Sequence, residues 1–168
     1  VDNLNRCVLV VAPHTDTMEY ILGNLSYWQL GKKLKIIIKD AHTKAWYGSV
    51  VKSLGGIGID RSQKNDLVNF VANEFKKDDF SLVITPEGTR SWVPKWRKGF
   101  YHMAVAAKVP IMLAAGDFKR KTIYLGYKIP YEKIASVPYE EVMEEIENYY
   151  IIHDIQPKIK ENWNPKIY

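Results

Sequence analysis

The sequence predicts an α/β fold, with a largely parallel mixed sheet flanked by helices in three layers. Short β-rich runs alternate with longer amphipathic segments along the 168 residues, which is typical of parallel sheets with crossover helices. With 46% hydrophobic residues, the chain is long enough to bury one substantial core. It is too short for two ordinary domains. We therefore expect residues 1–168 to form a single domain.

Six short apolar runs predict the strands. They are Arg6–Val11, Leu34–Ile38, Ile57–Ile59, Phe80–Thr85, Pro110–Ala115 and Thr122–Tyr127. Helices are expected between them, near Asp16–Gly31 and at Trp46–Leu54, Gln63–Lys77, Gly99–Ala107 and Tyr139–Ile152. In Asp16–Gly31 and Gln63–Lys77 the apolar residues recur at helical spacing. The tail Gln156–Tyr168 has little periodicity, so we expect it to run over the surface.

The charge and the cysteine content narrow the function classes. The net charge is +5 and the pI is about 9.1, which favours acidic partners such as anionic lipids, an acidic carrier protein, phosphorylated small molecules or nucleic acid. One cysteine, Cys7, builds neither a disulfide framework nor a zinc site. No segment approaches the roughly 18 apolar residues of a membrane-spanning helix, so we expect a soluble or peripheral chain.

Polar residues follow four of the predicted strands. His14 follows the first strand, Lys39 the second, Arg61 the third and Glu87–Arg90 the fourth. Ligands of open α/β sheets bind outside the carboxyl ends of the strands, so we expect a base, carboxylates and cations to meet at one edge. Each residue also has a local interpretation: a solvated strand end for Lys39, an ion pair with Asp60 or Asp66 for Arg61, and an ion pair between Glu87 and Arg90.

His14 is followed closely by two carboxylates, Asp16 and Glu19. An imidazole has an ordinary pKa of about 6.5, so it can accept a proton near neutral pH, and a carboxylate behind it fixes its tautomer. Asp16 and Glu19 also match a capping box, in which each side chain accepts a hydrogen bond from the other residue's amide. The two interpretations are compatible if His14 lies in the turn before the helix.

Four blocks occur in order along the chain: Ala12–Thr15 with a carboxylate at Glu19, Gly55–Ser62, Thr85–Arg90 and Val109–Met112. In this order they resemble the lysophosphatidate (1-acylglycerol-3-phosphate) acyltransferase family, the PlsC-like glycerolipid acyltransferases. The resemblance covers about Val8–Pro130, and the third block with its preceding strand is the most specific.

The resemblance implies that a fatty acyl group passes from acyl-CoA or acyl-carrier protein to a hydroxyl of a lysophosphatidate-like acceptor. It implies neither an acyl-enzyme nor a bound cofactor or metal. It makes His14 the general base and Glu19 its orienting carboxylate, with Asp16 as a second candidate for that role. The residues that it assigns to the substrate and its phosphate are Lys39, Arg61, Glu87, Gly88, Thr89 and Arg90.

Position 19 departs from the family pattern, which has aspartate there. The extra methylene of glutamate moves the carboxylate by about 1 Å or more, and a misplacement of that size can cost about a hundredfold in rate. Three alternatives are therefore open. Glu19 orients His14 from a shifted helix start, Asp16 does so instead, or the chain is a weak or inactive lipid-binding relative; we favour the first. A metal-dependent hydrolase with His14, Asp16 and Glu19 as ligands is a further alternative.

The loop Arg90–Lys98 interleaves Trp92 and Trp96 with cations. Tryptophan favours the membrane interface and cations favour anionic headgroups, so this loop is predicted to admit lipid. The alternative is a basic surface loop whose tryptophans pack inward. No nucleic-acid-binding motif accompanies the loop. We therefore expect an anionic membrane surface as a partner, no nucleic acid, and a peripheral location at the cytoplasmic face of the membrane.

Overall fold

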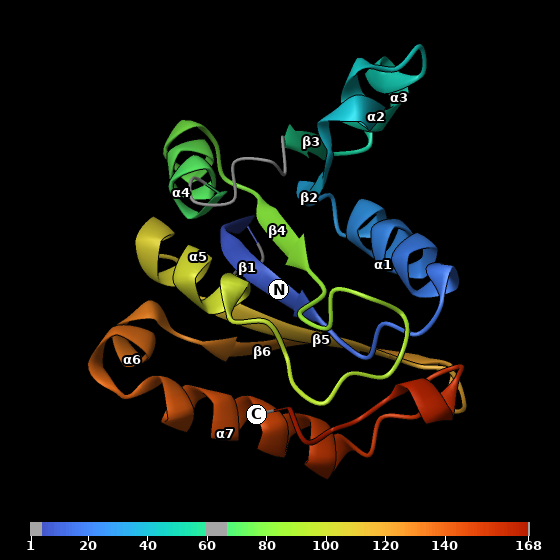
Figure 1. The fold of residues 1–168 in the computed structure, drawn as a ribbon, viewed down its shortest axis with the longest axis vertical. Helices are drawn as coiled ribbons and strands as arrows, with labels where there is room; N and C mark the ends of the chain where they lie inside the picture. The colour runs from blue at the N-terminus through green and yellow to red at the C-terminus, as the bar shows by residue number, and fades with distance from the viewer. Residues whose placement is uncertain (1–4, 60–66, 168) are drawn as a thin grey trace.

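The computed structural model describes residues 5–59 and 67–167. A six-stranded sheet with the order β3-β2-β4-β1-β5-β6 forms its middle layer (Figure 1). The strands are β1 (Cys7–Val11), β2 (Leu34–Lys39), β3 (Gly56–Ile59), β4 (Ser81–Ile84), β5 (Ile111–Asp117) and β6 (Thr122–Ile129). Neighbouring strands are parallel except β6, which runs antiparallel to β5. The predicted α/β fold with a largely parallel mixed sheet is confirmed.

The long helices lie close to their predicted positions. The helices are α1 (Thr17–Gln29), α2 (Asp40–Lys44), α3 (Gly48–Ser53), α4 (Leu67–Lys77), α5 (Gly99–Ala107), α6 (Tyr131–Ser136) and α7 (Tyr139–His153), followed by a 3-10 turn at Lys160–Asn162. The sequence pattern does not predict α2 and α6. Each is under two turns long, which is too short for an apolar period to show.

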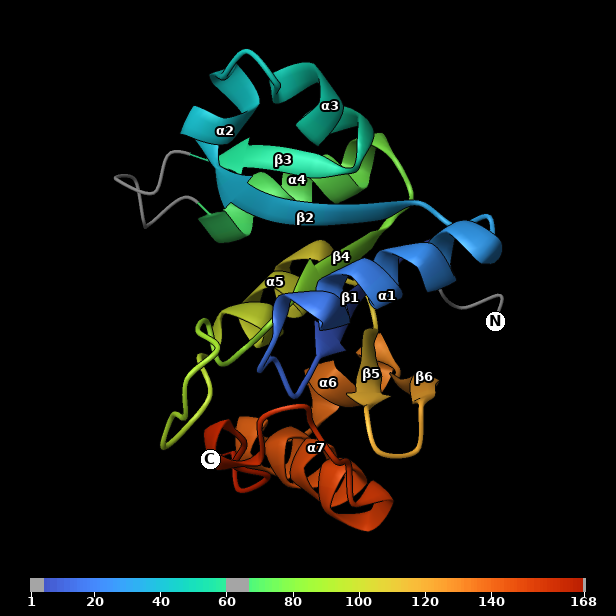
Figure 2. The same ribbon diagram turned by 90° about the vertical axis from the view of Figure 1, so that its right-hand side faces the viewer.

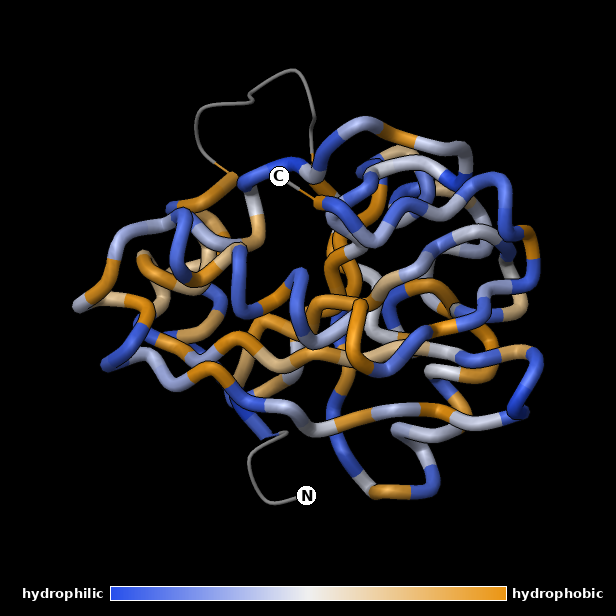
Figure 3. The backbone as a smooth tube through the Cα atoms, turned by 90° about the horizontal axis from the view of Figure 1, so that it is seen from below, coloured by the Kyte–Doolittle hydropathy of each residue, from blue (hydrophilic) through white to orange (hydrophobic). Residues whose placement is uncertain are grey.

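Helices cover the two faces of the sheet unequally. The larger core lies between the sheet and α4, α5 and α7, whereas α1 covers the other face (Figures 1 and 2). Side chains alternate along β1, so that Val8 and Val10 enter the larger core while Cys7 and Leu9 face α1. Hydrophobic stretches accordingly run through the middle of the molecule in Figure 3.

The tail after α7 alternates exposed lysines with apolar residues anchored in the core, so its predicted surface course is only partly right. Ile155 and Ile167 are buried, and the Trp163 ring contacts those of Trp96 and Tyr150. The amide of Trp96 donates to the carbonyl of Ile167 at 3.0 Å. Each apolar residue of the tail contacts the core separately. Their spacing is therefore too irregular to predict burial from the sequence.

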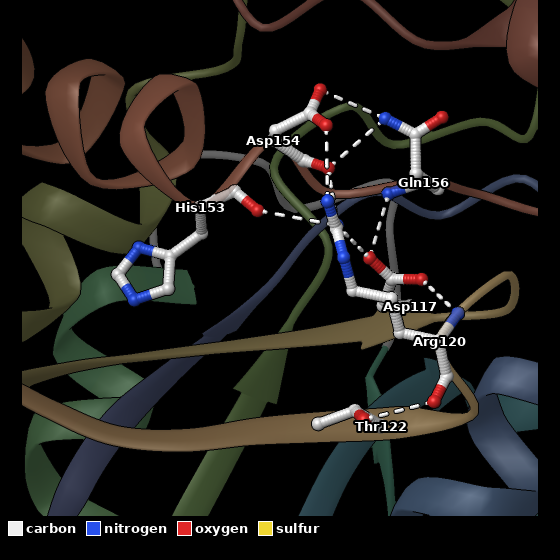
Figure 4. A network of polar contacts seen from close by, with 6 residues as sticks. All are labelled: Asp117, Arg120, Thr122, His153, Asp154 and Gln156. Carbon is white, nitrogen blue, oxygen red and sulfur yellow. Dashed lines mark hydrogen bonds and ion pairs between the residues drawn. The ribbon is translucent and has the colours of Figure 1, made fainter.

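A polar network joins the β5–β6 turn to the end of α7 (Figure 4). The buried carboxylate of Asp117 accepts from the Arg120 amide and guanidinium at 2.6 Å each, and from the amide of Gln156 at 3.2 Å. Arg120 also donates to the carbonyl of Asp154 at 2.8 Å. The amide of Phe118 donates to the carbonyl of Gln156 at 2.9 Å, so the tail is fixed beside the carboxyl end of β5.

Candidate active site

His14 lies in the short connection between β1 and α1. The Ala12–Pro13 peptide in this connection is cis. Asp16 caps α1, because its carboxylate accepts from the amide of Met18 at 2.8 Å. The connection places His14 at the carboxyl edge of the sheet with 21% of its side chain exposed.

Glu19, in the first turn of α1, faces the imidazole of His14. Its Oε2 lies 3.2 Å from His14 Nδ1, and its side chain is only 2% exposed. The amide of Thr15 donates to both carboxylate oxygens, at 2.8 and 3.1 Å, and the Thr15 hydroxyl donates at 2.8 Å. An ionised carboxylate can only accept, so Nδ1 carries the proton and Nε2 keeps its lone pair. The pair can therefore work as a base with an orienting carboxylate.

The predicted capping box is wrong in its details. Glu19 bonds to the amide of Thr15 rather than that of Asp16, and Asp16 accepts from Met18 rather than from Glu19. The turn at His14 brings the Thr15 amide within reach of the long glutamate side chain. Glu19, and not Asp16, is the carboxylate beside the imidazole.

Glu87 holds the backbone of His14. It lies in the loop after β4, is buried, and accepts from the amide of His14 at 2.9 Å. Burial, reinforced by the nearby charge of Glu19, raises the pKa of Glu87 to about 8. Two carboxylates thus fix His14, one through its ring and one through its amide.

The other predicted site residues take different positions. Gly88 has a φ of +68°, and a Cβ there would lie 2.8 Å from the guanidinium carbon of Arg97, so glycine suits both the turn and the packing. Thr89 is exposed and accepts from the amide of Ser91 at 3.3 Å. Arg90 is exposed and lines the same cavity as His14.

Lys39 is not among the residues that line the cavity with His14. Lys39 ends β2, where Ile36 and Ile38 line the cavity; side chains alternate along a strand, so the Cα–Cβ bond of Lys39 points to the opposite face. Arg61 lies outside the described residues. Their predicted contacts with a substrate phosphate stay predictions.

A cavity of about 580 Å³ lies between α1 and the sheet. His14, Glu19 and Arg90 line one end, and Tyr27 and Leu34 line the part near the end of α1 and the start of β2. The wall between them is mostly apolar and includes Leu9, Val11, Leu22, Ile36, Ile38, Val83, Ala114, Phe118, Ile123 and Leu125. The sequence does not predict this cavity, because the cavity depends on the distance between α1 and the sheet. The glycine within α1, Gly23, is the one local signal.

Within residues 5–59 and 67–167, no helix combines the length and the apolar character needed to cross a membrane. In the same ranges, no three His, Cys, Asp or Glu side chains gather as a potential metal site. The carboxylate of Asp16 is instead engaged by the Met18 amide and by Lys158 Nζ at 3.1 Å, so it does not join His14 and Glu19 as a ligand set.

Glu87 makes stability depend on pH. Its folded-state pKa lies above the ordinary value, so its contribution is fully present below about pH 4.5 and is lost as the pH rises through about 8. We expect Glu87→Gln to flatten the decline in Tm between pH 5 and 9, because glutamine keeps an acceptor for the His14 amide but does not titrate. Parallel Tm profiles of the wild type and Glu87→Gln in differential scanning fluorimetry would contradict this.

Three comparisons bear on the identity of the chain. A model of the acyltransferase family matches residues 2–114. An uncharacterized acyltransferase of Schizosaccharomyces pombe is 37% identical over 62 residues, which are 32% of this chain and 22% of that protein. The fold is similar to that of the 1-acyl-sn-glycerophosphate (LPA) acyltransferase PlsC from Thermotoga maritima, with a TM-score of 0.55 and 17% identity over 92% of this chain and 66% of that one. The chain thus spans less than two thirds of either protein. The family model matches well over half of the chain, including His14, Glu19 and Glu87, so the chain belongs to the acyltransferase family.

Proposed function

We propose that the protein is an O-acyltransferase that moves a fatty acyl group from acyl-CoA or acyl-carrier protein to a hydroxyl of a lysophosphatidate-like glycerolipid. The observation that carries the proposal is the apolar cavity that extends from His14 beneath α1. Its volume of about 580 Å³ is within the usual range of ligand sites. An acyl chain in this cavity would place its thioester carbonyl near the imidazole. The Thermotoga maritima protein of similar fold is named for a glycerophosphate acceptor, which supports an acceptor of this class.

In the proposed reaction, His14 Nε2 takes the proton of the acceptor hydroxyl while the oxygen attacks the thioester carbonyl carbon. The tetrahedral intermediate collapses, the carbon–sulfur bond breaks, and the leaving thiolate takes the proton from the imidazolium. Glu19 stabilises the imidazolium through Nδ1. Arg90, which lines the same end of the cavity, neutralises charge on the acceptor. No protein side chain is acylated.

Glutamate at position 19 is compatible with this role. Its carboxylate reaches His14 Nδ1 at 3.2 Å, and the Thr15 hydroxyl and amide hold it there. The carboxylate of Asp16 bonds to Met18 and Lys158 instead, which supports orientation of His14 by Glu19 rather than by Asp16.

Two substitutions test the base and its orienting carboxylate. We expect His14→Ala to abolish acyl transfer and Glu19→Gln to lower kcat by about a hundredfold or more, because glutamine does not stabilise the imidazolium. The measurement is release of free thiol from acyl-CoA or acyl-carrier protein in the presence of lysophosphatidate. Glu144→Gln, on an exposed position of α7, is the matched control. Full activity of Glu19→Gln would contradict the orienting role, and lipid binding by a wild type without turnover would identify a non-catalytic relative.

Gly23 offers a test of the cavity. It lines the cavity, and a Cβ built on it meets no atom within 4 Å, so a larger side chain there enters the cavity unopposed. We expect Gly23→Leu to raise the ratio of butyryl to palmitoyl transfer by about tenfold or more, because leucine takes the space of the distal chain. Leucine is also the better helix former, so α1 is retained. Equal losses with both donors, or no loss with either, would contradict an acyl chain in this cavity.

We also propose a peripheral position on an anionic membrane. Ile21, Leu25 and Trp28 share the outer face of α1 and are exposed, Trp28 by 76%. In the loop after β4, Trp92 is 52% exposed, whereas Trp96 is buried. The exposure of Trp92 supports a lipid-facing loop, while Trp96 follows the inward-packing alternative.

The membrane proposal is tested by sedimentation with vesicles. We expect binding to phosphatidylglycerol-containing vesicles and weak binding to pure phosphatidylcholine, with Trp28→Ser and Trp92→Ser each lowering the bound fraction. Ile152→Ser is the control, because Ile152 is exposed on α7, on the other side of the sheet. Equal and negligible sedimentation with both vesicles would count against a membrane surface.

A further inference from the structure

The tail after α7 returns to the edge of the sheet that carries His14. Ile155 and Pro157 are buried, and Gln156 is bonded through its amide to Asp117 and through its carbonyl to Phe118. These contacts fix the tail on both sides of Gln156. They bring Lys158 to the start of α1, where its Nζ lies 3.1 Å from the carboxylate of Asp16.

Asp16 pairs with Lys158, and the charge of Arg90 also acts on it from a distance. The amide of Met18 above all, then the Lys158 ammonium, and more weakly the charge of Arg90 lower the pKa of Asp16. Lys158 from the tail and Arg90 from the loop after β4 therefore both act on a carboxylate two residues from the proposed base. Lys158 lies outside residues 2–114, the part that matches the family model.

The ion pair of Lys158 and Asp16 leaves the lysine available. Its side chain is 46% exposed, and exposed ion pairs contribute little to stability. A phosphate monoester carries nearly two negative charges at neutral pH and three acceptor oxygens, so it competes well against a single carboxylate.

We propose that Lys158 is a phosphate-binding residue that, together with Arg90, holds the phosphate monoester of the acceptor. The inference rests on the proposed acyltransferase function, which it extends by a residue outside the part that matches the family model. Asp16 holds the ammonium at the start of α1. When the acceptor binds, the ammonium moves from the carboxylate to the phosphate.

The test compares the affinity of short-chain lysophosphatidate with that of the matching monoacylglycerol, by isothermal titration calorimetry. We expect Lys158→Gln to weaken lysophosphatidate binding about tenfold and to leave monoacylglycerol binding unchanged, because it removes one charge-assisted hydrogen bond to phosphate. Lys160→Gln, an exposed lysine in the same tail, is the control and is expected to change neither. Asp16→Asn keeps a good helix cap but removes the competing charge. It should tighten lysophosphatidate binding severalfold, and much of this gain should disappear in the double variant with Lys158→Gln.

Other results overturn the inference. Unchanged lysophosphatidate affinity in Lys158→Gln excludes a contact with phosphate, and equal weakening of both acceptors indicates that the lysine only anchors the tail. A wild type that binds both acceptors equally, or neither, also overturns it. If the wild type binds lysophosphatidate without releasing thiol from any donor, the proposed function fails, while the binding comparison still decides the role of Lys158.

Discussion

The hydrogen bond from the His14 amide to the buried carboxyl group of Glu87 joins the two loops on which the proposed active site depends. These loops leave β1 and β4, which are parallel neighbours in the sheet and therefore end at the same edge. Glu87 fixes the backbone of His14, and Glu19 fixes its ring from the first turn of α1. The imidazole is thereby held from two independent elements. The other parts of the site are arranged around this fixed point.

Helix α1 connects the proposed catalytic residues to the cavity. Its first turn carries Glu19, and its middle carries Gly23, which faces the cavity. Near its other end Tyr27 packs against the sheet, and its hydroxyl donates to Ser81 Oγ at 3.3 Å. One helix therefore orients the proposed base and also roofs the proposed acyl site. A displacement of α1 would alter both together.

The features that could be predicted from the sequence are those with a local signal. Apolar runs predicted the strands, and helical spacing of apolar residues predicted α1 and α4. The His14–Glu19 pair lies within six residues, so the sequence motif alone predicts it. Its detailed geometry depends on the Thr15 amide, which no residue pattern specifies.

Contacts between distant residues could not be predicted in this way. Glu87 meets the amide of His14 across 73 positions, and the sequence offered an equally good local partner in Arg90. Lys158 reaches Asp16 from a tail without periodicity. The cavity beneath α1 likewise has no sequence pattern, because it depends on how far a helix stands from the sheet.

The cavity beneath α1 also couples ligand binding to the stability of the fold. Its lining comes from α1 and from β1, β2, β4, β5 and β6, so a bound acyl chain would contact the helix and the sheet together. A ligand that binds the folded state alone stabilises it in proportion to the logarithm of its concentration. An acyl chain in this space would therefore hold α1 against the sheet, and the substrate proposed for the site would also stabilise the fold.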